Sequence, residues 1–171
     1  PNGFIKSRYI DDKACVAILF GVMKQLKEQG LRPLHTTHFY IANFEELGHG
    51  VSYIPPKVTE QLSIDIGTVG VTHNADEHSV SICAKDSRTT YDFAFRKKLV
   101  KLAQKNQIPY KVDVHYRYGS DASMSVLRGA DTNFACIGPG TDATHHYERT
   151  HTDAVMATAQ LLLAYLLQEE C

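Results

Sequence analysis

The sequence lacks a strong net charge, a long apolar run and any internal repeat. Lys and Arg total 18 against 19 Asp and Glu, so the charge does not predict binding to nucleic acid or to an anionic membrane. No apolar stretch is long enough to cross a bilayer. We therefore expect neither nucleic acid nor a membrane as a partner.

Paired cysteines are also missing. The four cysteines, Cys15, Cys83, Cys136 and Cys171, form no CxxC motif, so neither a zinc-thiolate knuckle nor a redox-active dithiol is indicated. The first three lie in apolar runs, where cysteine is typically a small core residue. Because no signal peptide is visible at the start, a reducing cytoplasm is the simplest location.

The remaining composition, 43% hydrophobic and 22% charged, is that of an ordinary globular domain. Hydrophobic periodicity predicts helices at about 12–28, 91–106 and 153–167, a short helical segment that opens at 119–121, and strands at about 34–42, 61–69, 78–84, 112–116 and 135–138. Because strands alternate with helices, we expect an α/β layered domain with a largely parallel sheet.

Several acidic residues stand at the ends of apolar elements, where a lone carboxylate is costly to bury. Asp11 directly precedes the first helix, and capping of that helix is the common role of such an Asp. Glu45 and Glu46 follow the expected strand at 34–42. Adjacent glutamates point to different sides, so one could bind a metal while the other moves protons. Solvated loop charges are the alternative.

Asp65 and a histidine-rich segment complete the unusual groups. Asp65 lies in an apolar strand pattern, where an Asp needs a partner. Ligands gather at the carboxyl ends of strands in open α/β sheets, where Glu45, Glu46 and Asp65 are expected. Within 145–151 (HHYERTH), His151 is best placed, at the mouth of the closing helix. Asp, Glu, Asp and His together suit zinc, cobalt or manganese.

Four sequence blocks, taken in order, resemble the M42 family of metallo-aminopeptidases, which includes glutamyl and tetrahedral aminopeptidases. They are RYIDDKA (8–14), FEELGHG (44–50), SIDIG (63–67) and ERTHTD (148–153). The resemblance covers essentially the whole chain. It implies a three-layer αβα zinc-exopeptidase-like fold with a mixed sheet. It also implies removal of residues from peptides with a free N-terminus, and homo-oligomers in the full-length protein.

The resemblance also assigns roles. Asp11 matches a carboxylate that bridges two divalent metal ions, with zinc the first expectation and cobalt or manganese as alternatives. Glu46 matches a ligand of one ion, Asp65 matches a further ligand whose ion the sequence does not decide, and His151 matches the terminal imidazole ligand. Glu45 matches the general base, which takes a proton from the attacking water and returns it to the leaving amine.

Three further residues belong to these blocks or lie near them. Asp12 and Lys13 continue the first block and are expected to support the ligands. Asp121 lies in a GSDA segment that resembles a family loop near the substrate. An N-cap on the next helix is an equally good interpretation of Asp121.

One family feature is missing upstream of Asp11, namely a His-x-Asp segment that supplies the remaining ligand. We therefore expect residues 1–171 to be the C-terminal portion of the catalytic domain, without that segment and without the inserted assembly domain. Such a fragment would bind one metal weakly, expose a sheet edge and be nearly inactive. A related dizinc deacylase or carboxypeptidase, or a non-catalytic binding domain on the same scaffold, are the alternatives.

Overall fold

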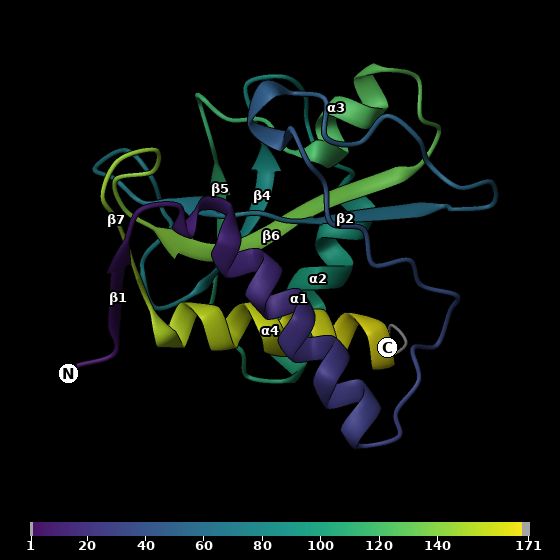
Figure 1. The fold of residues 1–171 in the computed structure, drawn as a ribbon, viewed down its shortest axis with the longest axis horizontal. Helices are drawn as coiled ribbons and strands as arrows, with labels where there is room; N and C mark the ends of the chain where they lie inside the picture. The colour runs from purple at the N-terminus through teal and green to yellow at the C-terminus, as the bar shows by residue number, and fades with distance from the viewer. Residues whose placement is uncertain (1, 169–171) are drawn as a thin grey trace.

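The computed structural model describes residues 2–168 and has helices on both sides of a mixed sheet (Figure 1). The helices are α1 (Ile10–Glu28), α2 (Phe93–Lys105), α3 (Asp121–Leu127), α4 (Thr152–Leu167) and the short 3-10 helix η1 (Glu45–Leu47). The strands are β1 (Phe4–Ser7), β2 (Glu60–Ile64), β3 (Gly67–Thr68), β4 (Val80–Lys85), β5 (Tyr110–Val114), β6 (Asn133–Thr141) and β7 (Glu148–His151).

Strand β6 is the centre of the main sheet. β2 and β3 lie parallel to it, with Ile64 opposite Ile137. β4 lies antiparallel along its other side, with Ile82 opposite Ile137, and β5 is parallel to β4. The order is β2-β6-β4-β5. Three of the four pairings are therefore parallel, which confirms a mixed and largely parallel sheet.

Side chains alternate between the two faces of this sheet, so neighbouring residues of one strand meet different helices. On one face, Ile82 belongs to a core with Leu99 of α2 and Leu161 of α4. On the other face, Cys83 packs with Ala122 of α3. Figure 1 shows α3 and α4 on opposite sides of the sheet. The predicted three-layer arrangement is confirmed.

Helix α1 packs on α4 through one apolar stripe. Ile18, Val22 and Leu26 recur every four residues and contact Leu162 and Leu166, as expected of a helix with one buried face. α1 also contacts β6 and β7. The start of α1, which carries Asp11, is thereby held against the sheet.

The strand predicted at 34–42 is not formed. Leu34, Tyr40 and Ile41 are exposed, and the segment takes part in no strand among residues 2–168. β propensity mainly expresses packing against neighbouring strands, so this β-branched and aromatic run stays irregular where it has no strand beside it. The prediction at 61–69 is partly right, because β2 and β3 are separated by Asp65 and Ile66.

Two short strands were not predicted. β1 and β7 form an antiparallel ribbon that pairs Phe4 with His151 and Ser7 with Glu148. No helix within residues 2–168 has the length and apolar character needed to cross a membrane.

Gly138 of β6 allows a close approach between strands that positions Asp65. A Cβ atom at this position would overlap the Asp65 carbonyl oxygen. The backbone N–H of Asp65 donates to the carbonyl of Ile137 at 2.9 Å. A larger residue at position 138 would push the Asp65 backbone away from β6 and break this hydrogen bond.

We predict that Gly138→Ala destabilises the chain by about 1–3 kcal/mol or more, because the added methyl must displace backbone. Gly21→Ala is the matched control. Gly21 lies inside α1 with open space around it, so alanine should stabilise the chain by about 0.5–1 kcal/mol. Urea unfolding measures both. Equal effects of the two substitutions would contradict the close approach at Gly138.

Candidate metal centre

The irregular start of α1 places two carboxylates side by side. Asp11 and Asp12 have non-helical backbone angles, with ψ values of 106° and 27°. Asp65 follows directly after β2 and is buried. One carboxylate oxygen from each of Asp11, Asp12 and Asp65 lies within 4.8 Å of the others. The predicted regions around Asp11 and around Asp65 therefore meet in space.

Glu46 and His145 approach Asp11 from another side. The His145 Nε2 atom lies 3.3 Å from Asp11 Oδ2 and 3.1 Å from Glu46 Oε2. Asp11, Glu46 and His145 form a second group whose ligand atoms lie within 4.8 Å of one another. Asp11 is the member that both groups share. We call Asp11, Asp12, Asp65, Glu46 and His145 the acidic centre.

Glu148 of β7 fixes two members of the acidic centre through their backbones. Its side chain is buried, and its two oxygens accept hydrogen bonds from the backbone N–H groups of Asp11, at 3.0 Å, and His145, at 2.9 Å. One carboxylate thus sets the positions of two residues that are more than 130 positions apart.

Burial raises the pKa values of Asp11, Asp12, Asp65 and Glu45. The pKa of Asp11 is raised to about 7 by burial and by Glu46, and that of Asp12 to about 8, mainly by burial. The pKa of Asp65 is raised well above its usual range by burial and by Asp12. Burial also raises the pKa of Glu45 to about 8. The cause throughout is that negative charges are buried together with too little positive charge.

The residues present fit divalent cations. Asp12 Oδ1 is buried without a hydrogen-bond partner, and the other acids of the centre share its shortage of positive charge. Carboxylate oxygens together with one imidazole are ligands that suit zinc, cobalt and manganese. A shared carboxylate, here Asp11, is typical of two-metal sites.

A pocket of about 540 Å³ lies beside this centre. Asp11, His145, Tyr118 and Arg117 are among the residues that line it. A substrate in the pocket would therefore contact the shared carboxylate and the imidazole directly.

His151 does not lie with the carboxylates, contrary to expectation. The backbone N–H of Asp153 donates to its Nδ1, at 3.1 Å. Its Nε2 lies 2.8 Å from the backbone carbonyl of Asn2, which can only accept. Both nitrogens of the neutral ring therefore have hydrogen-bond partners, and the ligand group to which His151 belongs, with His78 and Asp153, contains none of the carboxylates of the acidic centre.

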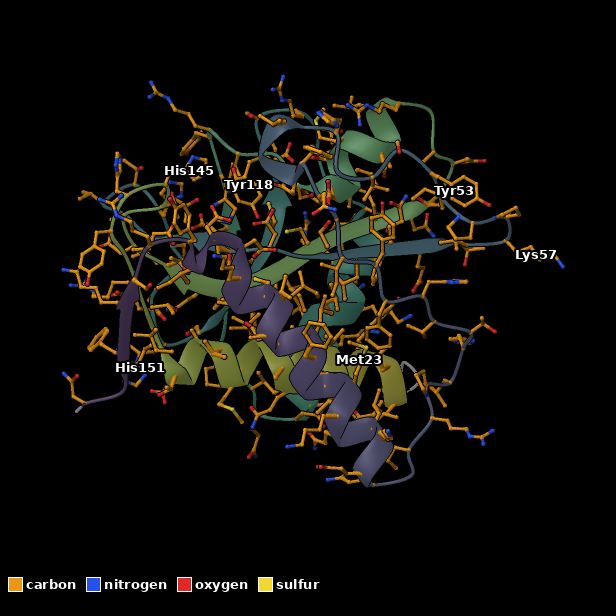
Figure 2. All side chains as sticks on the ribbon, viewed as in Figure 1. Met23, Tyr53, Lys57, Tyr118, His145 and His151 are labelled. Carbon is orange, nitrogen blue, oxygen red and sulfur yellow. The ribbon has the colours of Figure 1, made fainter. Side chains whose placement is uncertain are left out.

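The register of the β1–β7 ribbon explains this separation. Glu148 and His151 stand at opposite ends of β7, about 10 Å apart at the usual rise of a strand. Glu148 contacts Asp11, so His151 is directed toward the start of α4 instead. Figure 2 shows His145 and His151 at different levels of the molecule.

The other predicted residues are placed as follows. Glu45 and Glu46 lie on η1 and not at a strand end, so the local geometry differs from the expectation. Glu45 belongs to neither group of ligand atoms. Lys13 is exposed, and its Nζ lies 5.0 Å from the centre of the Tyr9 ring, away from the carboxylates.

Asp121 is not the N-cap of α3. Ser120 fills that position and forms a capping box with Ser123. Asp121 lies in the first turn, and its Oδ1 atom is buried without a partner among residues 2–168. After burial itself, the charge of Asp121 raises the pKa of Glu45 most. Asp121 therefore stands beside Glu45, outside both ligand groups.

Sequence reasoning missed the places of His145 and Glu148. His145 follows the carboxyl end of β6, which extends to Thr141, three residues beyond the predicted end of that strand. The rule that ligands gather beyond strand ends favours His145 over His151 once β6 is given its full length. No pattern in the sequence indicated that Glu148 would position Asp11 and His145, because that role depends on strand β7, which was not predicted.

We predict that the metal-free chain loses stability as the pH rises from about 4 to about 8. In that window the folded acids retain protons that the unfolded chain has released, so unfolding becomes easier with rising pH. Asp12→Asn removes one such acid and should make the decline shallower, by at most about 1.4 kcal/mol per pH unit. Urea unfolding with a chelator measures this, and the exposed Asp131→Asn is the control. If the free energy of unfolding fell equally steeply with pH in Asp12→Asn and in wild type, the pKa of Asp12 would not be raised in the folded chain.

Known proteins resemble this chain in sequence. The sequence model of the family described as M42 glutamyl aminopeptidase matches residues 1–161. The protein named "Putative aminopeptidase YhfE" from Bacillus subtilis (strain 168) is 46% identical over 166 residues, which are 96% of this chain and 48% of that protein.

Solved structures show the same fold. The TET1 peptidase of Pyrococcus horikoshii matches with a TM-score of 0.81 at 20% identity, over 97% of this chain and 51% of that chain. Aminopeptidase APDkam598 from Desulfurococcus kamchatkensis matches with a TM-score of 0.77 at 18% identity, over 95% of this chain and 48% of that chain. The chain thus spans about half the length of these relatives. Since the family model covers almost all of it, the chain belongs to the M42 glutamyl aminopeptidase family.

Proposed function

We propose that this chain carries most of a two-metal centre of an aminopeptidase, which removes residues from peptides with a free N-terminus. The observation that carries the proposal is the shared position of Asp11, which belongs both to the group with Glu46 and His145 and to the group with Asp12 and Asp65. Family membership supports a peptidase, and the two adjoining ligand groups support two metal ions.

The proposed ligands divide between the two groups. Asp11, Glu46 and His145 would hold one divalent cation, most simply zinc, and Asp11 and Asp65 would hold the other. His145 takes the role first expected of His151, because its Nε2 faces Asp11 and Glu46. When bound, such cations polarise a carbonyl and lower the pKa of water.

Glu45 is the proposed general base. It lies next to Glu46 on η1 but outside both ligand groups, so its carboxylate is not engaged by the proposed cations. In this role one Glu45 oxygen accepts the proton of the attacking water and then donates it to the nitrogen of the leaving amine. Asp121, beside Glu45, favours a carboxyl group that readily holds this proton.

The second ligand group is incomplete in this chain. Asp11, Asp12 and Asp65 are all carboxylates, and no imidazole within residues 2–168 joins them. Because the relatives are about twice as long, we propose that a histidine outside these residues completes the group and that the chain is the C-terminal portion of the catalytic domain. The 171-residue chain alone should then be nearly inactive.

Assembly and location are further parts of the proposal. The Pyrococcus horikoshii TET1 peptidase assembles into a tetrahedron or a large octahedral shell, which supports a homo-oligomer for the full-length protein. Three free and buried cysteines, Cys15, Cys83 and Cys136, fit a reducing compartment such as the cytoplasm.

We predict that His145→Ala weakens zinc or cobalt binding at least 10–100-fold, whereas His151→Ala leaves metal affinity unchanged. Loss of a ligand should cost at least what loss of a supporting hydrogen bond costs, and both ring nitrogens of His151 have hydrogen-bond partners. Titration calorimetry on the chain measures both affinities. The reverse result, with His151→Ala as the damaging change, would overturn the proposed ligand set.

Glu45→Gln should preserve metal binding and lower kcat by about 10²–10⁴-fold in the full-length protein that contains these residues. Aminoacyl-p-nitroanilides with free and with acetylated N-termini are the substrates, with added zinc or cobalt. Turnover of the acetylated substrates would favour the deacylase alternative. A protein that binds no metal and turns over neither substrate would favour the non-catalytic one.

Glu148→Ala should weaken metal affinity about 10–100-fold, because the backbones of Asp11 and His145 lose the acceptor that positions them. It should also cost at least about 1–3 kcal/mol of stability, since buried donors lose their partner. The exposed Glu28→Gln is the control and should change neither quantity. If Glu148→Ala lowered stability but left metal affinity intact, Glu148 would have no role in positioning the ligands.

A further inference from the structure

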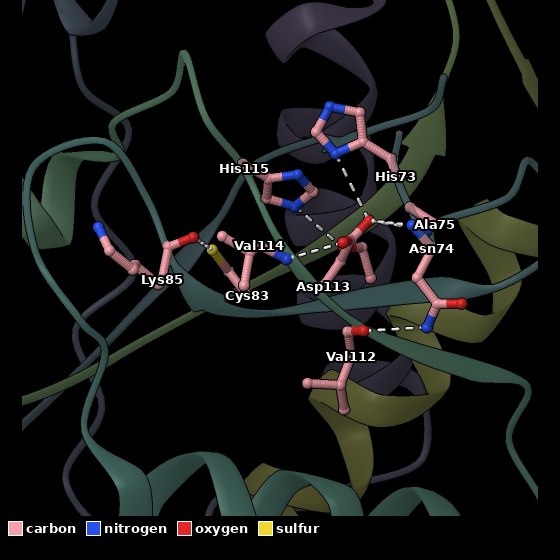
Figure 3. Close-up of polar contacts among 10 residues, drawn as sticks. His73, Asn74, Ala75, Cys83, Lys85, Val112, Asp113, Val114 and His115 are labelled. Carbon is pink, nitrogen blue, oxygen red and sulfur yellow. Dashed lines mark hydrogen bonds and ion pairs between the residues drawn. The ribbon is translucent and has the colours of Figure 1, made fainter. Parts of the chain in front are cut away.

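A second cluster of metal-ligating side chains lies outside the acidic centre. His73, Asp113 and His115 each offer one atom, and these atoms lie within 4.8 Å of one another. Asp113 belongs to β5 and His115 follows its end, so the two side chains, two positions apart, point to the same face of the sheet. His73 comes from the loop between β3 and β4. Figure 3 shows both rings turned toward the Asp113 carboxylate.

The cluster contains imidazole nitrogens that have no partner. His115 is only 1% exposed, and its Nδ1 atom makes no hydrogen bond. Its other nitrogen, Nε2, lies 3.3 Å from Ser81 Oγ. His73 Nδ1 is also buried without a hydrogen bond, and lies 3.6 Å from Asp113 Oδ2. An unpaired buried nitrogen is costly, and two of them around one carboxylate need an explanation.

Asp113 is held rigidly by backbone donors. Its Oδ2 accepts from the N–H groups of Asn74 and Ala75, at 2.7 and 2.8 Å. Among residues 2–168, its Oδ1 accepts a hydrogen bond from Val114 alone, at 2.7 Å. Each carboxylate oxygen has two lone pairs, so Oδ1 retains one while Oδ2 is fully used. The free lone pair lies in the same cluster as the two unpaired imidazole nitrogens.

The Ser81 contact completes the pattern of a metal-binding histidine. Such a histidine usually donates its second ring N–H to a neighbouring acceptor, which fixes the tautomer and orients the ring. With the proton of His115 on Nε2 and directed at Ser81 Oγ, the Nδ1 atom retains an unshared lone pair.

We propose that His73, Asp113 and His115 bind a third divalent cation, separate from the acidic centre. Two imidazoles and one carboxylate are ligands that suit zinc and related transition metals such as cobalt and nickel. His73 also lines the pocket that contains Asp11 and His145. His73 therefore belongs both to this cluster and to the wall of that pocket.

The geometry argues against two simpler roles. An ion pair between His73 and Asp113 would leave His115 Nδ1 unpaired. Ser81, His115 and Asp113 have the residue types of a hydrolytic triad, but Ser81 is only 2% exposed, so a substrate has no access to its hydroxyl. A cation satisfies both unpaired nitrogens and the free lone pair of Asp113 at once.

The test uses the Asp11→Asn/Glu46→Gln double variant of the chain, in which the acidic centre is disabled. We expect it to bind one equivalent of Co²⁺ at this cluster, seen by titration and by the visible absorption of cobalt. His73→Ala in this background should remove that equivalent. Ser81→Ala should weaken binding about 10–100-fold. The exposed His38→Ala is the control and should leave cobalt binding unchanged. Circular dichroism verifies folding of each variant.

Two outcomes would overturn this proposal. One is a double variant that binds no cobalt. The other is cobalt binding that His73→Ala leaves within twofold, including the case in which His73→Ala only lowers the free energy of unfolding, as loss of a plain ion pair would. The same cobalt titration tests the proposed function independently. It fails if wild type binds no more cobalt than the Asp11→Asn/Glu46→Gln variant, whatever His73→Ala does.

Discussion

Mutual repulsion between buried carboxylates is the constraint around which this molecule is arranged. Asp11, Asp12 and Asp65 approach one another where water is largely excluded, and each would be more stable apart from the others. The fold holds them together with backbone interactions that carry no compensating charge. Asp65 is fixed by the close pairing of β2 with β6, and Asp11 by the carboxylate of Glu148. Carboxylates held together in this way favour binding of positive charge, which agrees with the metal site proposed here.

Much of the scaffold could be predicted from the sequence. The spacing of Ile18, Val22 and Leu26 identified α1, and the apolar runs identified the strands of the main sheet, because these signals are local and repeat regularly. The prediction of a strand at 34–42 was wrong for the opposite reason. The residues of this segment favour a strand, but strand formation depends on a neighbour that may lie far away in sequence, and composition does not reveal it.

The same distinction between local and distant information applies to the candidate metal centre. Asp65 was recognisable by itself, because an Asp in an apolar strand pattern is locally anomalous, whereas Asp11 and Glu46 were assigned through the family resemblance. The choice between His145 and His151 could not be made locally. It required the length of β6 and the pairing of β1 with β7, which together direct one histidine to the carboxylates and the other to the cap of α4. The cluster of His73, Asp113 and His115 likewise becomes visible only when the loop before β4 is placed beside β5.

The proposed ligands differ in how firmly the surrounding chain is anchored. Asp11 and Asp65 lie against the sheet, whereas η1 has no fully buried residue, and the side chains of Leu47 and of the preceding Phe44 face solvent. Segments with so little packing open locally at small free-energy cost and exchange their amide hydrogens early. Glu46 and Glu45 therefore occupy a part of the chain that can leave and return while the rest stays folded. A cation bound by the proposed ligands would order this segment, so the proposed ligand Glu46 and the proposed base Glu45 would become fixed together.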